Sequence, residues 1–148
     1  MAVDTARTQD VYKDAGKSVN FTTLLLNRKD QAEEREVIAD MADRIQAIKR
    51  SVNIRANNAG LGIALGFSRK AWDYLFPGAP VPKELEDFQG VKGDKQDVPA
   101  VAADIFLHVR SNDESVTYTV VDQIMEFLRP ISSVVDETHG FHYEQGRA

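Results

Sequence analysis

Two strand–helix–strand patterns follow one another along this chain, and their order restricts the fold more than any other feature. In the first pattern, β-type runs over 18–27 and 61–66 flank an amphipathic helix. In the second, runs over 104–110 and 131–138 flank another. Two such units can interleave into a four-stranded antiparallel sheet with the helices on one face. The sequence therefore predicts an α+β, ferredoxin-like domain over 18–148.

The predicted helices have polar starts and apolar stripes. Asp30 and Glu33 have the spacing of a capping box, and Ser111 and Glu114 repeat that spacing before the second long helix. Ser68 can cap a short helix that ends at 77–78. The stripes consist of Val37, Met41, Ile45, Ile48 and Val52 in the first helix, and of Val116, Val120, Ile124 and Phe127 or Leu128 in the second.

Two segments fall outside this pattern. Residues 1–17 are a polar N-terminal arm, mobile or laid along the surface. Residues 77–103 are rich in Pro, Gly, Lys and Asp and show no period, which predicts a long surface loop. Loops of this length are uncommon inside a domain and are often functional.

One face of the predicted sheet has no helix over it. We expect it to carry Leu24, Leu26, Phe106 and His108. A single ferredoxin-like unit leaves such a face uncovered, so it should meet a second unit or another chain.

The strand at 61–66 alternates large residues with Gly62, Ala64 and Gly66. Small residues on one face allow a backbone, an aromatic ring or a flat ligand to approach closely. Tight packing of a helix on the sheet explains the same pattern equally well, and the sequence leaves both readings open.

Composition excludes several classes of function. The net charge of -5 and the pI of about 5.2 disfavour nucleic-acid binding, because the basic pairs at 49–50 and 69–70 lie within helical patterns. The chain has no cysteine, which excludes thiolate metal sites and cysteine nucleophiles and fits a cytoplasmic location. No apolar stretch is long enough for a membrane span, and 1–17 has no secretory pattern.

No catalytic constellation or metal site is predicted. His139 and His142 could share a metal only on a helix, and Gly140 after a strand argues against one. His108, in mid-strand, is interpreted as a hydrogen-bonded structural residue. Ser68 has no nucleophile-elbow setting, and the strand glycines do not form a dinucleotide loop. The acidic residues at 33–34 and 84–87 are expected on exposed faces.

Three segments, in this order, resemble the N-terminal half of the dye-decolourising haem peroxidases, in the branch with the porphyrinogen-peroxidase-like enzymes. They are Gly62-Ile63-Ala64-Leu65-Gly66-Phe67-Ser68 with Trp72, then Asp104-Ile105-Phe106-Leu107-His108-Val109-Arg110, and Glu137-Thr138-His139-Gly140-Phe141-His142-Tyr143 leading to Gly146-Arg147. The resemblance covers 61–148, and residues 1–60 match it in pattern alone.

The resemblance implies two ferredoxin-like halves, with haem held mainly by the second. The family's Gly-x-x-Asp-Gly motif would begin just after Ala148, and its proximal histidine and distal arginine would lie further on. We therefore expect no catalytic residue and no bound haem in this chain alone, and His108, His139 and His142 align with other positions. The region of Phe141 is the candidate for a haem contact from this half.

Two functions follow as expectations. The first is the N-terminal domain of a peroxidase that oxidises dyes or porphyrinogens, inactive until a haem-binding half or self-association completes it. The alternative is a free-standing ferredoxin-like dimer that binds a ligand or serves assembly. Both predict a homo-oligomer that binds neither nucleic acid nor membrane.

Overall fold

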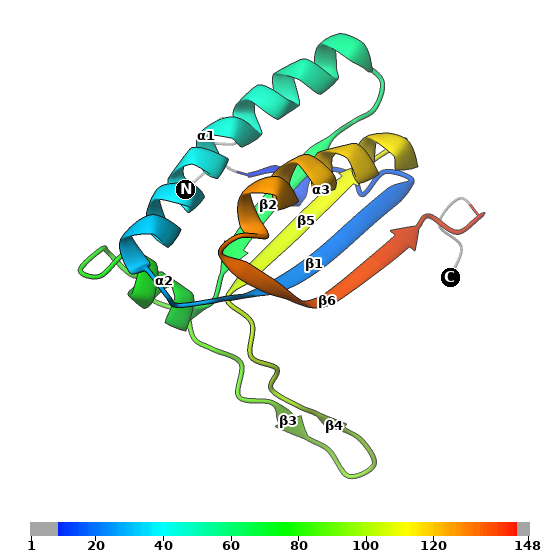
Figure 1. Ribbon diagram of the computed structural model, residues 1–148. Helices are drawn as coiled ribbons and strands as arrows, with labels where there is room; N and C mark the ends of the chain where they lie inside the picture. The colour runs from blue at the N-terminus through cyan, green and yellow to red at the C-terminus, as the bar shows by residue number, and fades with distance from the viewer. Residues whose placement is uncertain (1–8, 145–148) are drawn as a thin grey trace.

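Four strands form one antiparallel sheet in the order β2-β5-β1-β6 (Figure 1). This computed structural model describes residues 9–144. The strands are β1 (Ser18–Leu26), β2 (Gly62–Phe67), β5 (Ile105–Ser111) and β6 (Ser132–Phe141). Because β1 lies between strands from the far end of the chain, the two strand–helix–strand units interleave. The predicted ferredoxin-like α+β fold is confirmed.

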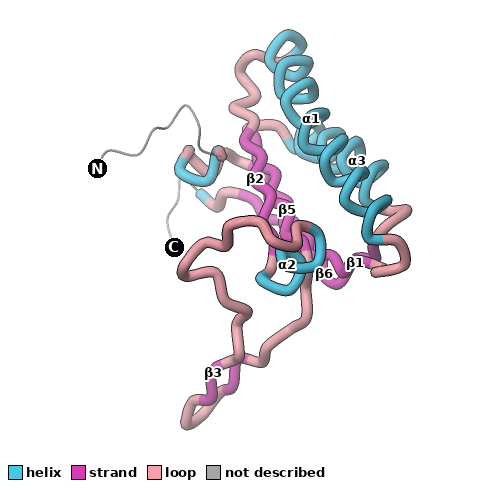
Figure 2. The backbone as a smooth tube through the Cα atoms, turned by 90° about the vertical axis from the view of Figure 1, so that its left-hand side faces the viewer, coloured by secondary structure: helices cyan, strands magenta, loops and turns pink. Residues whose placement is uncertain are grey.

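The two long helices, α1 (Gln31–Arg55) and α3 (Glu114–Leu128), lie on the same side of the sheet (Figure 2). A short helix, α2 (Arg69–Leu75), follows β2 directly. The remaining elements are a 3₁₀ turn at Asp10–Tyr12, β3 (Val91–Lys92) and β4 (Asp97–Val98). No helix among residues 9–144 is both long enough and apolar enough to cross a membrane.

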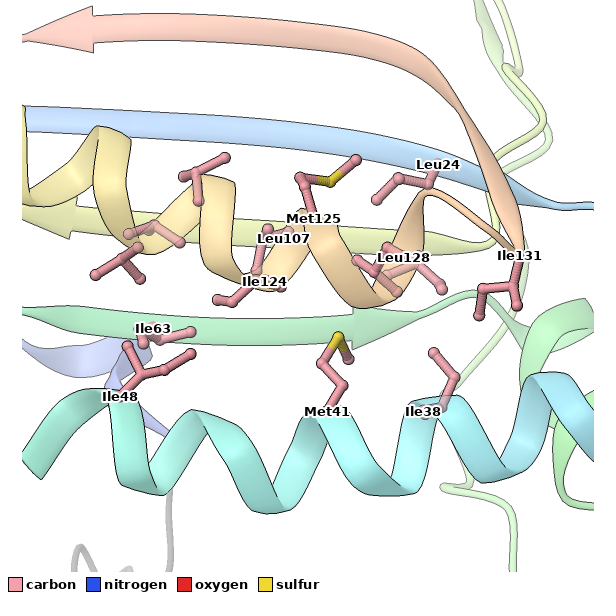
Figure 3. Close-up of a cluster of buried hydrophobic side chains, with 14 of the residues drawn as sticks. Leu24, Ile38, Met41, Ile48, Ile63, Leu107, Ile124, Met125, Leu128 and Ile131 are labelled. Carbon is pink, nitrogen blue, oxygen red and sulfur yellow. The ribbon is translucent and has the colours of Figure 1, made fainter. Parts of the chain in front are cut away.

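The core fills the space between the sheet and the two long helices (Figure 3). Met41 and Ile124 are fully buried from the helices, and Leu107 from β5. The stripe of α1 is turned slightly from the prediction: Ile38 is buried, whereas Val37 and Ile45 are only partly buried. In α3 the buried set also includes residues outside the predicted stripe: Thr117, Val121 and Met125.

Two predicted helix caps are confirmed and one is wrong. The Ser68 hydroxyl oxygen accepts a hydrogen bond from the Ala71 backbone N–H at 3.1 Å and caps α2. The Asp30 carboxylate accepts a hydrogen bond from the Glu33 backbone N–H at 3.1 Å and caps α1. The cap of α3 is Asp113, which accepts from the Ser115 N–H, so the prediction of Ser111 in this role was wrong. Ser111 pairs with Ser18 and ends β5, and this pairing keeps it in the sheet.

The prediction that Leu24 and Leu26 lie on the uncovered face was also wrong. Their exposed fractions are 0% and 5%, and they belong to the core. Leu24 pairs with the buried Ile105, which places both side chains on the helix side of the sheet. The run 18–27 has apolar residues on both faces, so its alternation does not say which face is buried. Phe106 and His108 do lie on the uncovered face.

Two segments differ in extent from the prediction. Strand β6 continues to Phe141, three residues beyond the predicted end, because it remains paired with β1 up to Ser18. The loop 77–103 contains the small β3–β4 hairpin, which projects from the body in Figure 1. Residues 1–8 of the predicted arm and the Gly146-Arg147 pair lie outside the described residues.

Candidate functional site

The sheet face away from α1 and α3, called here the open face, carries an aromatic group at its centre. The rings of Phe21 and Phe106 stack with centroids 5.8 Å apart and planes at 14°. His108 lies 4.6 Å from Phe21, ring centre to ring centre. Beside them, Ala64 pairs with His108 and Gly66 with Phe106 on β2. The open face therefore presents a flat aromatic surface next to a strip of small residues.

The surroundings of His108 favour the neutral form of its imidazole. Burial, with a smaller contribution from the positive charge of Arg110, lowers the pKa of its imidazole below the usual 6.5. The imidazole of His108 lies beside the rings of Phe21 and Phe106. The neutral ring thus acts as a third member of the aromatic group.

The glycines of β2 have two different roles. A Cβ at Gly62 would lie 3.1 Å from the Arg110 Nε, so this glycine makes room for the arginine. A Cβ at Gly66 would lie 3.6 Å from the Phe106 Cβ, an ordinary contact. Both glycines lie on the open face, away from α1 and α3, and a Cβ at Gly62 would also lie 3.5 Å from the Asp10 Cβ of the 3₁₀ turn, so Gly62 allows this short helical turn to approach the sheet closely.

Residues 9–13 run along β2 and cover one end of the open face. The Gln9 side chain pairs with the backbone N–H and C=O of Leu65 at 2.7 and 3.0 Å. Arg110, 4% exposed, donates to the carbonyl oxygens of Asp10 and Lys13. The polar composition of this segment predicted an arm that is mobile or laid along the surface, and no motif in it indicated these contacts.

The Asp10 carboxylate links this segment to α1 through an ion pair with Lys49. It lies against the ammonium groups of Lys13 and Lys49. Burial would raise the pKa of Asp10, but hydrogen bonds from the two lysines outweigh that effect and hold it below the usual value.

A second buried polar group joins four elements at the other end of the sheet. Asp104 accepts two hydrogen bonds from the Arg28 guanidinium, both at 2.7 Å, and one from the Leu26 N–H at 2.8 Å. Glu34, expected on an exposed face, is 2% exposed and accepts from the Arg28 N–H. The prediction for Glu34 was wrong because its partners come from distant parts of the chain.

Tyr74 completes this group, and its hydroxyl should ionise at an unusually high pH. Its hydroxyl donates to the Glu34 carboxylate at 2.5 Å, and this bond, aided by burial, raises the pKa of Tyr74 to about 12. Absorbance at the phenolate band during alkaline titration should show one tyrosine ionising well above the ordinary pKa of about 10.

The variant Tyr74→Phe should remove the ionisation step at high pH. The variant Glu34→Gln should shift the pKa of Tyr74 back toward the ordinary range. If the ionisation step at high pH remains in Tyr74→Phe, it does not belong to Tyr74.

A groove of about 360 Å³ lies on the other side of the sheet, between α3 and β6. At its floor Asn20 donates to Glu137 at 3.1 Å, and Glu137 lies 2.8 Å from His139. His139 therefore lies on the side of the sheet opposite His108. Residues 9–144 contain no group of three or more His, Cys, Asp or Glu side chains that could hold a metal ion. Phe141, at the end of β6, is 79% exposed.

Comparison with known proteins identifies the family. The family model described as "Dyp-type peroxidase, N-terminal" matches residues 8–142. A dye-decolorizing peroxidase of Rhodococcus erythropolis is 34% identical over 118 residues, which are 80% of this chain and 34% of that protein.

Two solved structures have a similar fold. The crystal structure of a dye-decolorizing peroxidase from Bacteroides thetaiotaomicron has a TM-score of 0.86 at 30% identity, and the match covers 95% of this chain and 45% of that one. A variant of DypB from Rhodococcus jostii RHA1 in complex with heme has a TM-score of 0.83 at 24% identity, covering 94% and 44%. The chain thus spans less than half the length of these relatives, and it belongs to the Dyp-type peroxidase N-terminal family.

Proposed function

We propose that this chain is one half of a haem peroxidase that oxidises dyes or porphyrinogens, and that it is inactive until a haem-binding half joins it. The family assignment and the partial coverage of the relatives support this proposal, since the match to the Rhodococcus erythropolis enzyme leaves most of that protein without a counterpart here. In this arrangement the chain forms one wall of the site.

The open face is the surface that we assign to the second half. Phe106 is 41% exposed, and Phe21 and His108 beside it are partly exposed. Large aromatic side chains at the centre of a surface are the residues that contribute most to binding at protein interfaces. The small residues Ala64 and Gly66 let a partner approach the sheet closely.

Haem is the cofactor of this family, and in this proposal the chain does not bind it without a second half. An iron ligand must point into a cavity that fits the macrocycle. His108 lies beside the rings of Phe21 and Phe106 on the open face, and His139 bonds to Glu137 in a groove on the other side of the sheet. Haem ligation therefore belongs to the partner in this proposal.

Complementation tests the proposal. The chain is mixed with the separately expressed C-terminal half of a DyP-type peroxidase, and peroxide-dependent dye oxidation is measured with haem present. The N-terminal half of that same enzyme is the positive control. We expect association and activity with both N-terminal halves and none with either half alone. If the control works and this chain neither associates nor restores activity, the proposal is wrong.

A haem titration tests whether the chain binds haem without the second half. We expect no saturable Soret band typical of histidine ligation when haem is added to the chain alone. A saturable band at one haem per chain would mean that His108, His139 or His142 ligates iron, and the second half would not be needed for cofactor binding.

The open face also favours a second candidate, a free-standing dimer in which two copies place these faces together around a flat ligand. Sedimentation at working concentration distinguishes the two: this candidate requires a dimer without any added half. A homo-oligomer of the completed peroxidase and a cytoplasmic location remain part of the first proposal. Size-exclusion chromatography and cell fractionation test them.

A further inference from the structure

Strand β6, ten residues long, is an edge of the sheet, and no strand of residues 9–144 pairs with its outer side. The His142 N–H donates to the Lys17 carbonyl at 3.0 Å. Antiparallel pairs alternate between bonded and non-bonded, so the bonds to β1 continue at Gly140 and Thr138. The backbone N–H and C=O groups of Glu137, His139 and Phe141 therefore point away from the sheet.

The side chains of these three residues lie on the helix side of the sheet. On that side, α3 packs over β1 and β5 and leaves a groove beside β6. Glu137 and His139 line the groove between β6 and α3, with Ser18, Asn20 and Thr22 of β1 also lining it. A strand added outside β6 would share the pleat of its neighbour, so every second side chain would enter this groove. The free backbone and the groove thus form one continuous binding surface.

The groove has an apolar part and an acidic part. Val121 and Met125 of α3 and Val134 of β6 supply the apolar part. Among residues 9–144, three carboxylates line the groove, and Arg129, the only Lys or Arg of this lining, is paired with Asp122 at 2.9 Å. Within this described lining, the carboxylates of Glu114 and Glu137 have no arginine or lysine partner, and Glu137 bonds to Asn20 and His139. A basic side chain opposite Glu137 would complement this charge.

We propose that β6 and this groove bind an extended segment of another protein by strand addition, and that the segment presents basic and apolar side chains to the groove. The backbone of the segment pairs with Glu137, His139 and Phe141, a Lys or Arg meets Glu137, and an aliphatic side chain reaches Val121 and Met125. This surface lies on the opposite side of the sheet from the open face, and the proposal stands independently of the peroxidase function.

The probe is a capped nine-residue peptide in which threonines alternate with two lysines and then two valines. A second peptide with glutamates in place of the lysines is the charge control. We expect the lysine peptide to bind at least tenfold more tightly, as measured by fluorescence anisotropy. Amide hydrogen exchange should slow at Glu137, His139 and Phe141 on binding, while Gly140, already bonded to β1, should not change.

Charge reversal provides the matched variants. Glu137→Lys should weaken binding of the lysine peptide at least tenfold, whereas Glu126→Lys, on an exposed part of α3 outside the groove, should leave it unchanged. Unchanged thermal melting checks that both variants fold.

Three results would overturn the proposal. One is no binding at millimolar peptide, or equal binding of both peptides. Another is protection of amides elsewhere on the sheet. The third is a dimer whose β6 amides are already protected without peptide, since β6 would then serve pairing with a second copy.

Discussion

Replacing Phe106 by glutamate should lower the affinity of this chain for a haem-binding half at least about thirtyfold, since central aromatic residues can each contribute about 2 kcal/mol or more. Phe106 stacks on Phe21 and is 41% exposed, so its ring is available to a partner. Phe106→Glu puts a charge into the middle of that contact, where it would be desolvated without a partner. The measurement is a titration of complementation activity against chain concentration.

Ile54→Glu is the matched control. Ile54 is 85% exposed near the end of α1, in the helix layer, so the same change in polarity occurs far from the open face. It should leave complementation unchanged. Both variants should unfold at the same urea concentration as the parent chain, because neither side chain is in the core. If Phe106→Glu complements as well as Ile54→Glu, the open face is not the docking surface.

The sequence was sufficient for the parts of the fold that depend on local periodicity. The stripe through Met41 and Ile48 predicted α1, and the alternation of Ile105, Leu107 and Val109 predicted the buried side of β5. Alternation was insufficient in β1, where both faces are rich in apolar residues. There the pairing of Leu24 with Ile105 decides which face is buried, and that pairing joins residues far apart in the chain.

The candidate site was predicted only in part, for the same reason. Phe106 and His108 were placed on the open face from β5 alone. Phe21 joins them through the register between β1 and β5, which a single strand does not contain. The groove beside β6 exists because α3 packs over β1 and β5 rather than over β6. No local pattern around Glu137 or His139 indicates where α3 lies relative to β6.

The buried carboxylates were the least predictable feature. Asp10, Glu34 and Asp104 are each at most 5% exposed, yet their sequence neighbourhoods resemble ordinary surface segments. Each is buried because a cation or a backbone N–H from a distant segment reaches it, as Lys49 reaches Asp10. Charge patterning assigns such residues to the surface by default, and the correction requires the tertiary structure.

The largest loss of stability from one of these groups is expected for Asp104→Ala. The Asp104 carboxylate is almost fully buried and satisfies both the Arg28 guanidinium and the Leu26 N–H. Removing it leaves the Leu26 N–H buried without a partner and breaks the bidentate ion pair. We expect a loss of about 2–3 kcal/mol in the free energy of unfolding, below the usual range for a broken buried pair, since Arg28 remains partly hydrated.

The measurement for Asp104→Ala is urea unfolding at neutral pH, compared at equal slope with the parent chain. Asp73→Ala is the control, because Asp73 pairs with Arg69 at 2.8 Å where both side chains are exposed. An exposed pair one helical turn apart contributes only about 0.5 kcal/mol, so this variant should unfold near the parent midpoint. Equal effects of the two substitutions would mean that Asp104 and Arg28 are no more strongly coupled than a surface pair. A much larger effect of Asp104→Ala identifies this carboxylate as the group that holds the start of β5 against the end of β1.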